Sequence, residues 1–195
     1  MVDVDFWVAL LAVIAVVIAA GWYLSYSAAR LDRLHAKAEG SLSVLDAQLI
    51  RRAESSLELA TSGSLDPASA LLVADAATAA LERHPSQPVG EDPLDGQHFG
   101  GFEGVETDLT RALCAALTVE TVAAVHASGE DSPGVDALDR VRASALRVQM
   151  ARRFHNEAVR EVRRVRAKRV VRAFHLAGHA ALPEPVLFDD DLPGQ

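Results

Sequence analysis

Apolar residues follow two different patterns along the chain. Residues 6–24, FWVALLAVIAVVIAAGWYL, are nineteen consecutive positions without a charge. From residue 31 onward, apolar residues instead recur every three or four positions among polar ones, which is the spacing of a helix with one buried face. As a helix the first run is about 28 Å long, close to the hydrocarbon thickness of a bilayer. The pattern therefore predicts a membrane-spanning helix followed by amphipathic helices.

The aromatic residues with polar groups gather at the two ends of the apolar run. Trp7 lies at one end, and Trp22, Tyr23 and Tyr26 lie at the other, as expected for rings at the two membrane–water interfaces. Two alternatives are a buried core helix of a soluble protein and a signal peptide cleaved near residues 27–29. The second normally begins with basic residues, whereas this chain begins MVDVD. We predict a transmembrane anchor over residues 1–26.

Basic residues follow the apolar run and do not precede it. Arg30, Arg33 and Lys37 lie just after it, so the positive-inside rule places the amino terminus outside and the rest of the chain in the cytoplasm. A single cysteine, Cys114, allows no intrachain disulfide and agrees with a reducing compartment. The prediction is a single-pass protein of the cell membrane with a cytoplasmic carboxyl-terminal domain.

The remaining apolar periodicity predicts four helices. The first continues from the anchor to Gly63, and the other three cover residues 67–83, 103–127 and 135–175. Asp66 and Pro67 supply an N-cap and a first helical residue. The fold class is all-α, a single N-terminal transmembrane helix followed by an antiparallel four-helix bundle. The candidate core positions are Leu31, Leu34, Ala38, Leu45, Leu49, Ala53, Ala60, Leu71, Leu72, Ala76, Leu81, Leu109, Leu113, Leu117, Val122, Val141, Ala145, Val148, Ala151, Ala158, Val162 and Val165.

Proline, glycine and acidic residues set the remaining boundaries. The bundle is predicted over residues 27–182, with a flexible acidic tail at 183–195. Within the bundle, residues 84–102 are rich in Pro and Gly and predict a long loop, for which a flexible crossover and a binding loop are both open.

Charge is segregated along the sequence. Residues 140–172 contain twelve Lys or Arg against Glu157 and Glu161, a net +10, so the rest of a chain with net charge −8 carries −18. The arginines either pair with acids of the other helices or face an anionic membrane. Nucleic acid is the third interpretation, but no aromatic platform or binding motif accompanies the charge, and we predict no nucleic-acid partner. The candidate lipid- or partner-binding residues are Arg153, Arg160, Arg163, Arg164, Arg166, Lys168, Arg169 and Arg172.

The sequence contains no motif that specifies catalysis. His175 and His179 are four residues apart, but Gly178 interrupts the helix between them, and neither a His-Glu-x-x-His motif nor a phosphate-binding loop occurs. We interpret these histidines and His155 as surface residues. Cys114 lies in the apolar stretch Leu-Cys-Ala-Ala-Leu and is predicted to be an inert core thiol. We therefore predict no enzyme, no catalytic or metal-binding residue and no cofactor.

Two short stretches resemble a known family. Residues 45–52, LDAQLIRR, and 151–160, ARRFHNEAVR, together with the amino-terminal span and the closing Phe-Asp-Asp at 188–190, are similar to the LemA family. His155 stands where that family commonly has Tyr, and its Asn-Leu-Val run after the basic pair is absent. The resemblance implies a membrane-anchored helical bundle without an established catalytic activity. Asn156 and Arg153 are expected either to hydrogen-bond to the first helix near Gln48 and Arg52 or to face water.

The expected function is therefore a scaffold or partner-binding module at the cytoplasmic membrane face, with the bilayer and an unknown protein as partners. The alternative is a sensor of anionic lipid surfaces that uses the basic last helix. A membrane-tethered hydrolase or metal enzyme is a more remote alternative.

Overall fold

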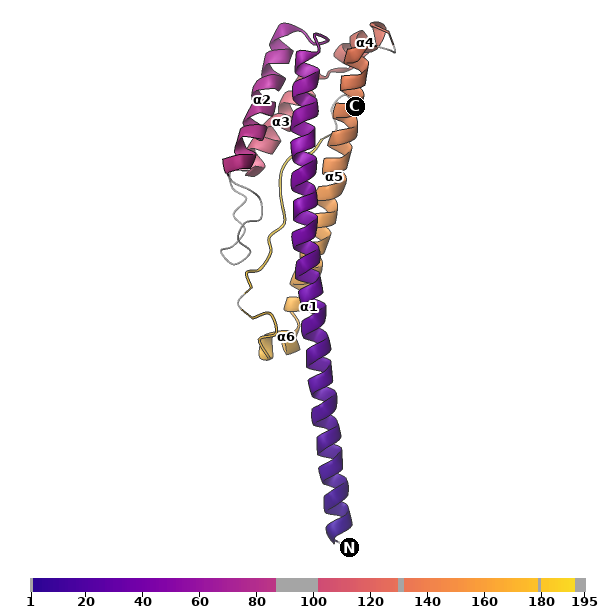
Figure 1. Ribbon diagram of the computed structural model, residues 1–195, viewed down its shortest axis with the longest axis vertical. Helices are drawn as coiled ribbons and strands as arrows, with labels where there is room; N and C mark the ends of the chain where they lie inside the picture. Colours follow the sequence, from indigo (N-terminus) through magenta and orange to yellow (C-terminus); the bar gives the residue numbers. More distant parts are fainter. Residues whose placement is uncertain (1, 87–101, 130–131, 179, 192–195) are drawn as a thin grey trace.

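The computed structural model describes residues 2–86, 102–129, 132–178 and 180–191, which form helices joined by turns and end in an extended segment (Figure 1). The helices are α1 (Val2–Thr61), α2 (Pro67–Ser86), α3 (Phe102–Ala116), α4 (Val119–Ala127), α5 (Pro133–Arg166) and α6 (Arg169–Ala173). The helices α1, α2, α3 and α5 run alternately up and down, which confirms the predicted all-α antiparallel bundle. The loop predicted at 84–102 lies largely outside the described residues, since α2 extends to Ser86 and α3 begins at Phe102.

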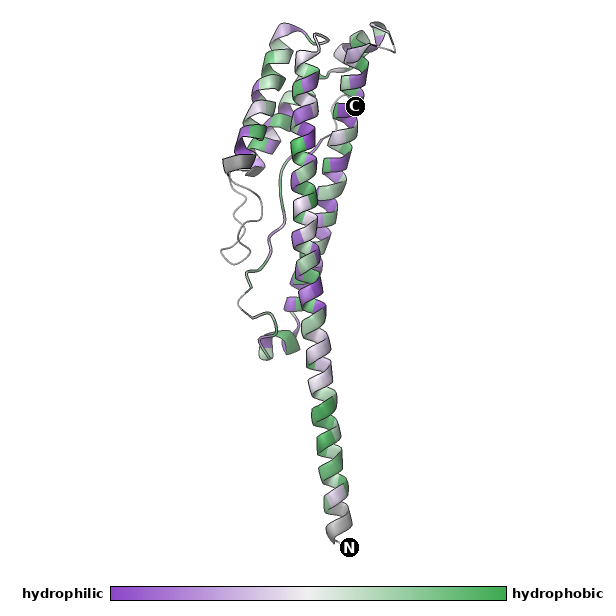
Figure 2. Cartoon of the chain, viewed as in Figure 1, coloured by the Kyte–Doolittle hydropathy of each residue, from purple (hydrophilic) through white to green (hydrophobic). Residues whose placement is uncertain are grey.

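The first helix joins the apolar run to the bundle without a break. α1 contains 60 residues, about 90 Å of helix. Its amino-terminal part is apolar and exposed on all sides, and it extends beyond the other helices (Figure 2). An 18-residue window of this helix is apolar enough to cross a membrane, and none of it is buried in the bundle. From Leu31 onward, one face of the same helix is buried, as the spacing of three or four residues between apolar positions predicted.

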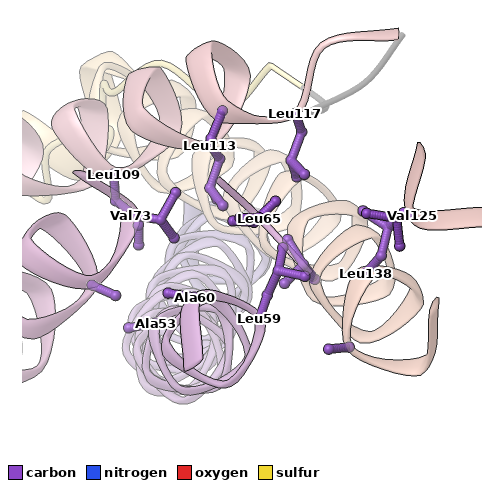
Figure 3. Close-up of a cluster of buried hydrophobic side chains, with 14 of the residues drawn as sticks. Ala53, Leu59, Ala60, Leu65, Val73, Leu109, Leu113, Leu117, Val125 and Leu138 are labelled. Carbon is purple, nitrogen blue, oxygen red and sulfur yellow. The ribbon is translucent and has the colours of Figure 1, made fainter. Parts of the chain in front are cut away.

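The core is built from small residues and leucines. The largest cluster fills the end of the bundle far from the amino terminus, where α1, α2, α3 and α5 meet (Figure 3). Two smaller clusters continue toward the amino-terminal end between α1 and α5. All the core positions predicted on α1 and α5 are buried, as are Leu109, Leu113 and Leu117. Val122 is partly buried against the main cluster.

The prediction of which face of α2 is buried is wrong, because the buried face is rotated by a fraction of a turn from the predicted one. Leu71 is 72% exposed and Leu72 is 47% exposed, whereas Val73, Ala77 and Ala80 are fully buried. Small side chains at this spacing form their own stripe and let α2 approach α1 and α3 closely. Ala76 and Leu81 lie at the edge of that stripe and are partly buried.

Two predicted helices are each interrupted. The helix predicted at 103–127 ends at Ala116, and α4 starts after a 65° bend. The Thr118 side chain caps α4 by accepting a 3.2 Å hydrogen bond from the amide of Thr121. The helix predicted at 135–175 ends at Arg166 and is followed by α6. The first break consists of Leu117 and Thr118 and the second of Ala167 and Lys168, so neither Gly nor Pro indicates them in the sequence.

The segment predicted to be a flexible tail is instead packed, over residues 183–191. We call residues 180–191 the C-terminal strap; it runs back from α6 along the bundle (Figure 1). The Asn156 side chain donates to the carbonyl of Val186 at 2.9 Å and accepts from its amide at 2.8 Å. Thr110 donates to the carbonyl of Asp189 at 2.7 Å, and Phe188 is buried. The strap thus bridges α3 and α5, because side chains on both helices satisfy its backbone.

Candidate functional site

The basic end of α5 lies at the end of the bundle nearest the apolar run. There the first buried turns of α1 pack against α5 and α6 in one apolar cluster, which contains Leu31, Leu34, Ala38, Ala158, Val162, Val165 and Val171. Leu31 is seven residues after the last residue of the apolar run, about 10 Å along the helix. We call this end of the molecule, formed by residues 160–182 and the adjacent turns of α1, the base of the bundle.

The upstream arginines of the basic stretch pair with carboxylates. Arg140 forms a two-bond pair with Glu58 at 2.8 and 2.9 Å, and Arg152 forms one with Asp190 at 2.7 and 2.8 Å. Arg160 binds Glu157 one turn earlier on the same helix at 2.6 Å. Of these three arginines, only Arg140 pairs with an acid of another helix, as the interpretation of pairing with the other helices expected, whereas the partners of Arg152 and Arg160 lie in the strap and on α5 itself. Arg153 is exposed and makes no salt bridge with any described residue.

The downstream arginines bind backbone carbonyls of the strap or face solvent. Arg163 donates from Nε to the carbonyl of Pro183 at 2.8 Å, and Arg166 donates from one terminal nitrogen to the carbonyls of Ala180 and Ala181 at 2.9 and 2.7 Å. None of the remaining basic residues of the base forms a salt bridge within the described part of the chain; they are Arg164, Lys168, Arg169 and Arg172.

An open hollow of about 940 Å³ separates α6 from the end of α5 and the start of the strap. Arg163, Arg166, Arg169, Arg172 and His175 line it. The chain reverses direction beside the hollow through two residues with positive φ, His175 at 50° and Gly178 at 56°. The reversal brings the strap back against α5 and keeps the four arginines around one space.

The histidines do not form a metal site among the described residues, in which no group of three His, Cys, Asp or Glu side chains is placed to hold an ion. His175 is exposed, and His179 lies outside the described residues. His155, expected at the surface, is fully buried between α1 and α5, where its Nδ1 lies 3.1 Å from the Ser41 hydroxyl. Burial lowers the pKa of the His155 imidazole, because the charged form loses its hydration.

Cys114 is exposed on α3, so the prediction of a core thiol is wrong. It follows Leu113, which occupies the buried face, and an apolar sequence context alone did not reveal the rotation of the helix. Partial desolvation and the Asp191 carboxylate raise the pKa of this thiol, which disfavours the reactive thiolate at neutral pH.

A buried ionic cluster escaped the sequence analysis. Arg52 on α1 is 2% exposed and donates to a carboxylate oxygen of Glu106 on α3 at 2.7 Å. Arg83 on α2 lies 3.6 Å from the other oxygen of the same carboxylate. Arg52 also donates to Thr110 at 3.0 Å. The sequence contained a signal for the burial of Arg52, because this residue lies three positions after Leu49 and therefore on the buried face of the first helix.

Comparisons with protein-family models, with curated proteins and with solved structures found no match. The resemblance to the LemA family therefore stays a prediction. In the two stretches that carry it, Arg52 and Asn156 are structural. Arg52 joins α1 to α3, and Asn156, expected to bond to the first helix or to face water, binds the strap instead.

Proposed function

We propose that this protein is a single-pass membrane protein whose helical bundle is a non-enzymatic, LemA-like scaffold or partner-binding module at the cytoplasmic face of the cell membrane. The observation that carries the proposal is the continuity of α1, which is exposed and apolar in its first part and buried along one face from Leu31 onward. A continuous helix between span and bundle transmits position and orientation, whereas a flexible linker would not. Such a helix suits a module that presents a surface at a fixed height above the bilayer.

The orientation follows from the charges beside the span. Arg30, Arg33 and Lys37 follow the apolar run, and the arginines of the base lie at the same end of the bundle. Both sets favour the cytoplasmic side.

The exposed Cys114 offers a test of the orientation, because it is the one cysteine of the chain. A membrane-impermeant maleimide applied to intact cells should leave Cys114 unlabelled and should label it once the cells are permeabilised. A control variant that combines Cys114→Ser with Asp3→Cys has its one cysteine on the other side of the apolar run, and it should already be labelled in intact cells. Labelling of Cys114 in intact cells would place the bundle outside and refute the proposed location.

Insertion of the span is tested by Ala15→Arg, at the centre of the apolar run. An arginine there costs about 2.5–3.5 kcal/mol of insertion free energy, so a large fraction of the variant should be extracted from membranes by alkaline carbonate. Full retention of the variant in the membrane would indicate peripheral attachment.

The partner-binding role is tested by affinity capture of the full chain from solubilised membranes, with residues 1–40 alone as the control bait. A protein retained by the full chain and lost from the control binds the bundle. The enzyme alternative predicts a different result, a stoichiometric metal ion in the purified protein, which elemental analysis would detect.

A second candidate function, a sensor of anionic lipid surfaces, is favoured by the arginines of the base that pair with no described carboxylate. Each basic residue near an anionic leaflet contributes about 1 kcal/mol. Residues 27–195, which contain every core residue, should bind phosphatidylserine vesicles and be released by salt. Equal binding to neutral phosphatidylcholine vesicles would contradict this function.

A further inference from the structure

The hollow at the base is lined by four arginines and by no described carboxylate residue. Arg163, Arg166, Arg169 and Arg172 line it, and no Asp or Glu belongs to the described lining. The carboxyl end of α5 contributes about half a negative charge nearby, which is small beside four permanent positive charges. Because like charges repel, an excess of positive charge around one space favours the binding of an anion there.

Two of the arginines are held in place by the strap. The bond from Arg163 to Pro183 uses Nε only, and the bonds from Arg166 to Ala180 and Ala181 use one terminal nitrogen. No described residue accepts a hydrogen bond from the remaining nitrogens of either guanidinium. Guanidinium groups with fixed orientation and free donors are suited to bidentate binding of phosphate oxygens.

A second cavity beside the hollow bears on whether the phosphate belongs to a lipid or comes from solution. A second cavity, of about 310 Å³, shares Ala177 and Leu182 with the hollow and is also lined by Leu31 and Ala38 of α1. Its carboxylates, Asp32 and Glu39, disfavour a second anion there. A space lined by arginines beside one lined in part by Leu31, Ala38 and Leu182 matches an amphiphile whose charged group and hydrocarbon part are adjacent.

We propose that the hollow binds the phosphate group of an anionic phospholipid, with the glycerol and first acyl carbons against the adjoining cavity. The inference rests on the proposed membrane location for the source of the ligand, and on the four arginines for its chemistry. The α1 turns that line the adjoining cavity begin about 10 Å after the apolar run, just above the headgroup layer, which is about 5–8 Å thick on each side of the bilayer. This is a defined site, whereas the surface sensor described above needs only diffuse charge.

The test uses the full chain in neutral maltoside micelles and native mass spectrometry, with three probes. Dioctanoyl phosphatidic acid carries an exposed phosphate, dioctanoyl phosphatidylcholine carries a neutral headgroup, and inorganic phosphate carries no apolar part. One-to-one binding of phosphatidic acid, with neither of the other probes bound at the same concentration, is the expected result. Equal binding of inorganic phosphate would overturn the lipid as the source, and no binding of either anion would overturn the site.

Two double variants, each of which removes two positive charges, distinguish binding at a defined site from binding to a diffuse charged surface. Arg169→Gln with Arg172→Gln removes two lining residues that form no hydrogen bond to any described residue of the strap, so the fold should be kept. Arg153→Gln with Arg164→Gln removes the same charge from α5 outside the hollow. The first pair should weaken phosphatidic acid binding by about 10- to 100-fold, since a charge-assisted hydrogen bond is worth roughly tenfold or more; the second should change it by less than about threefold.

Equal losses in the two pairs would refute the defined site and leave only the diffuse surface. Circular dichroism at 222 nm on both pairs establishes that the helices are intact. The cysteine-labelling experiment tests location without reference to lipid binding, so failure of the proposed location and failure of this site give different results.

Discussion

Among the charged side chains of the bundle, the buried carboxylate of Glu106 should contribute most to the free energy of unfolding. Glu106 is fully buried, accepts a 2.7 Å bond from Arg52 and lies 3.6 Å from Arg83. Glu106→Gln keeps the size of the side chain but removes the charge opposite an arginine that is 2% exposed. Breaking a buried ion pair from one side costs about 3–5 kcal/mol, because the remaining charge is left without compensation.

The effect can be measured on residues 27–195 by urea denaturation followed at 222 nm. The transition midpoint should fall with an unchanged slope, and the melting temperature should fall by about 6–20 °C for a domain of this size. Glu58→Gln is the matched control: Glu58 pairs with Arg140 at 2.8 Å, but their side chains are 53% and 50% exposed. Loss of this exposed pair should cost less than about 1 kcal/mol.

A double-mutant cycle completes the test. Arg52→Met combined with Glu106→Gln should destabilise the bundle by less than the sum of the single changes, because the apolar chain removes the uncompensated charge. The reasoning is refuted if Glu106→Gln costs no more than the exposed control, or if the two changes are additive.

Three further changes test other parts of the structure. Asn156→Ala should destabilise the bundle by about 1–3 kcal/mol and speed amide hydrogen exchange at Val186, since both backbone groups of that residue lose their partner; unchanged exchange there would contradict the role of Asn156. His155→Gln should flatten the pH dependence of stability below about pH 6.5. Because the pKa of His155 is lowered in the folded state, that state binds fewer protons than the unfolded one, and the native protein loses stability as the pH falls from about 6.5 toward the lowered pKa. An equally steep loss of stability in the variant would refute this assignment. Gly134→Ala should destabilise by about 1–3 kcal/mol, because the added methyl group would overlap the Ser64 side chain; a melting temperature equal to that of the native chain would exclude this close approach.

Helix positions and the buried faces of the two long helices could be read from the sequence. Leu31, Leu45 and Leu49 on α1, and Val148 and Val162 on α5, are buried as their spacing predicted. A long helix in contact with one partner along its length carries a regular apolar stripe, and regularity over many turns leaves one choice of face. The same argument holds for the apolar run, whose length and lack of charge identify it without a tertiary partner.

The face of α2 and the position of Cys114 depended on tertiary structure. Helix α2 is rich in alanine, so several faces are apolar enough to be buried, and the close contact at Val73 and Ala77 decided between them. In α3, Leu113 and Cys114 are adjacent, and only the position of neighbouring helices determines which one points inward.

The amino-acid sequence by itself determined the long apolar helix, the helical class and the concentration of positive charge near the end of the chain, because each of these depends on residues close together in sequence. Only the tertiary structure decided which arginines are neutralised. Arg152 binds Asp190, whereas Arg163 and Arg166 bind backbone carbonyls. The C-terminal strap makes this difference: its packing against α3 and α5 depends on polar side chains far apart in the sequence, which converge only when the helices are assembled.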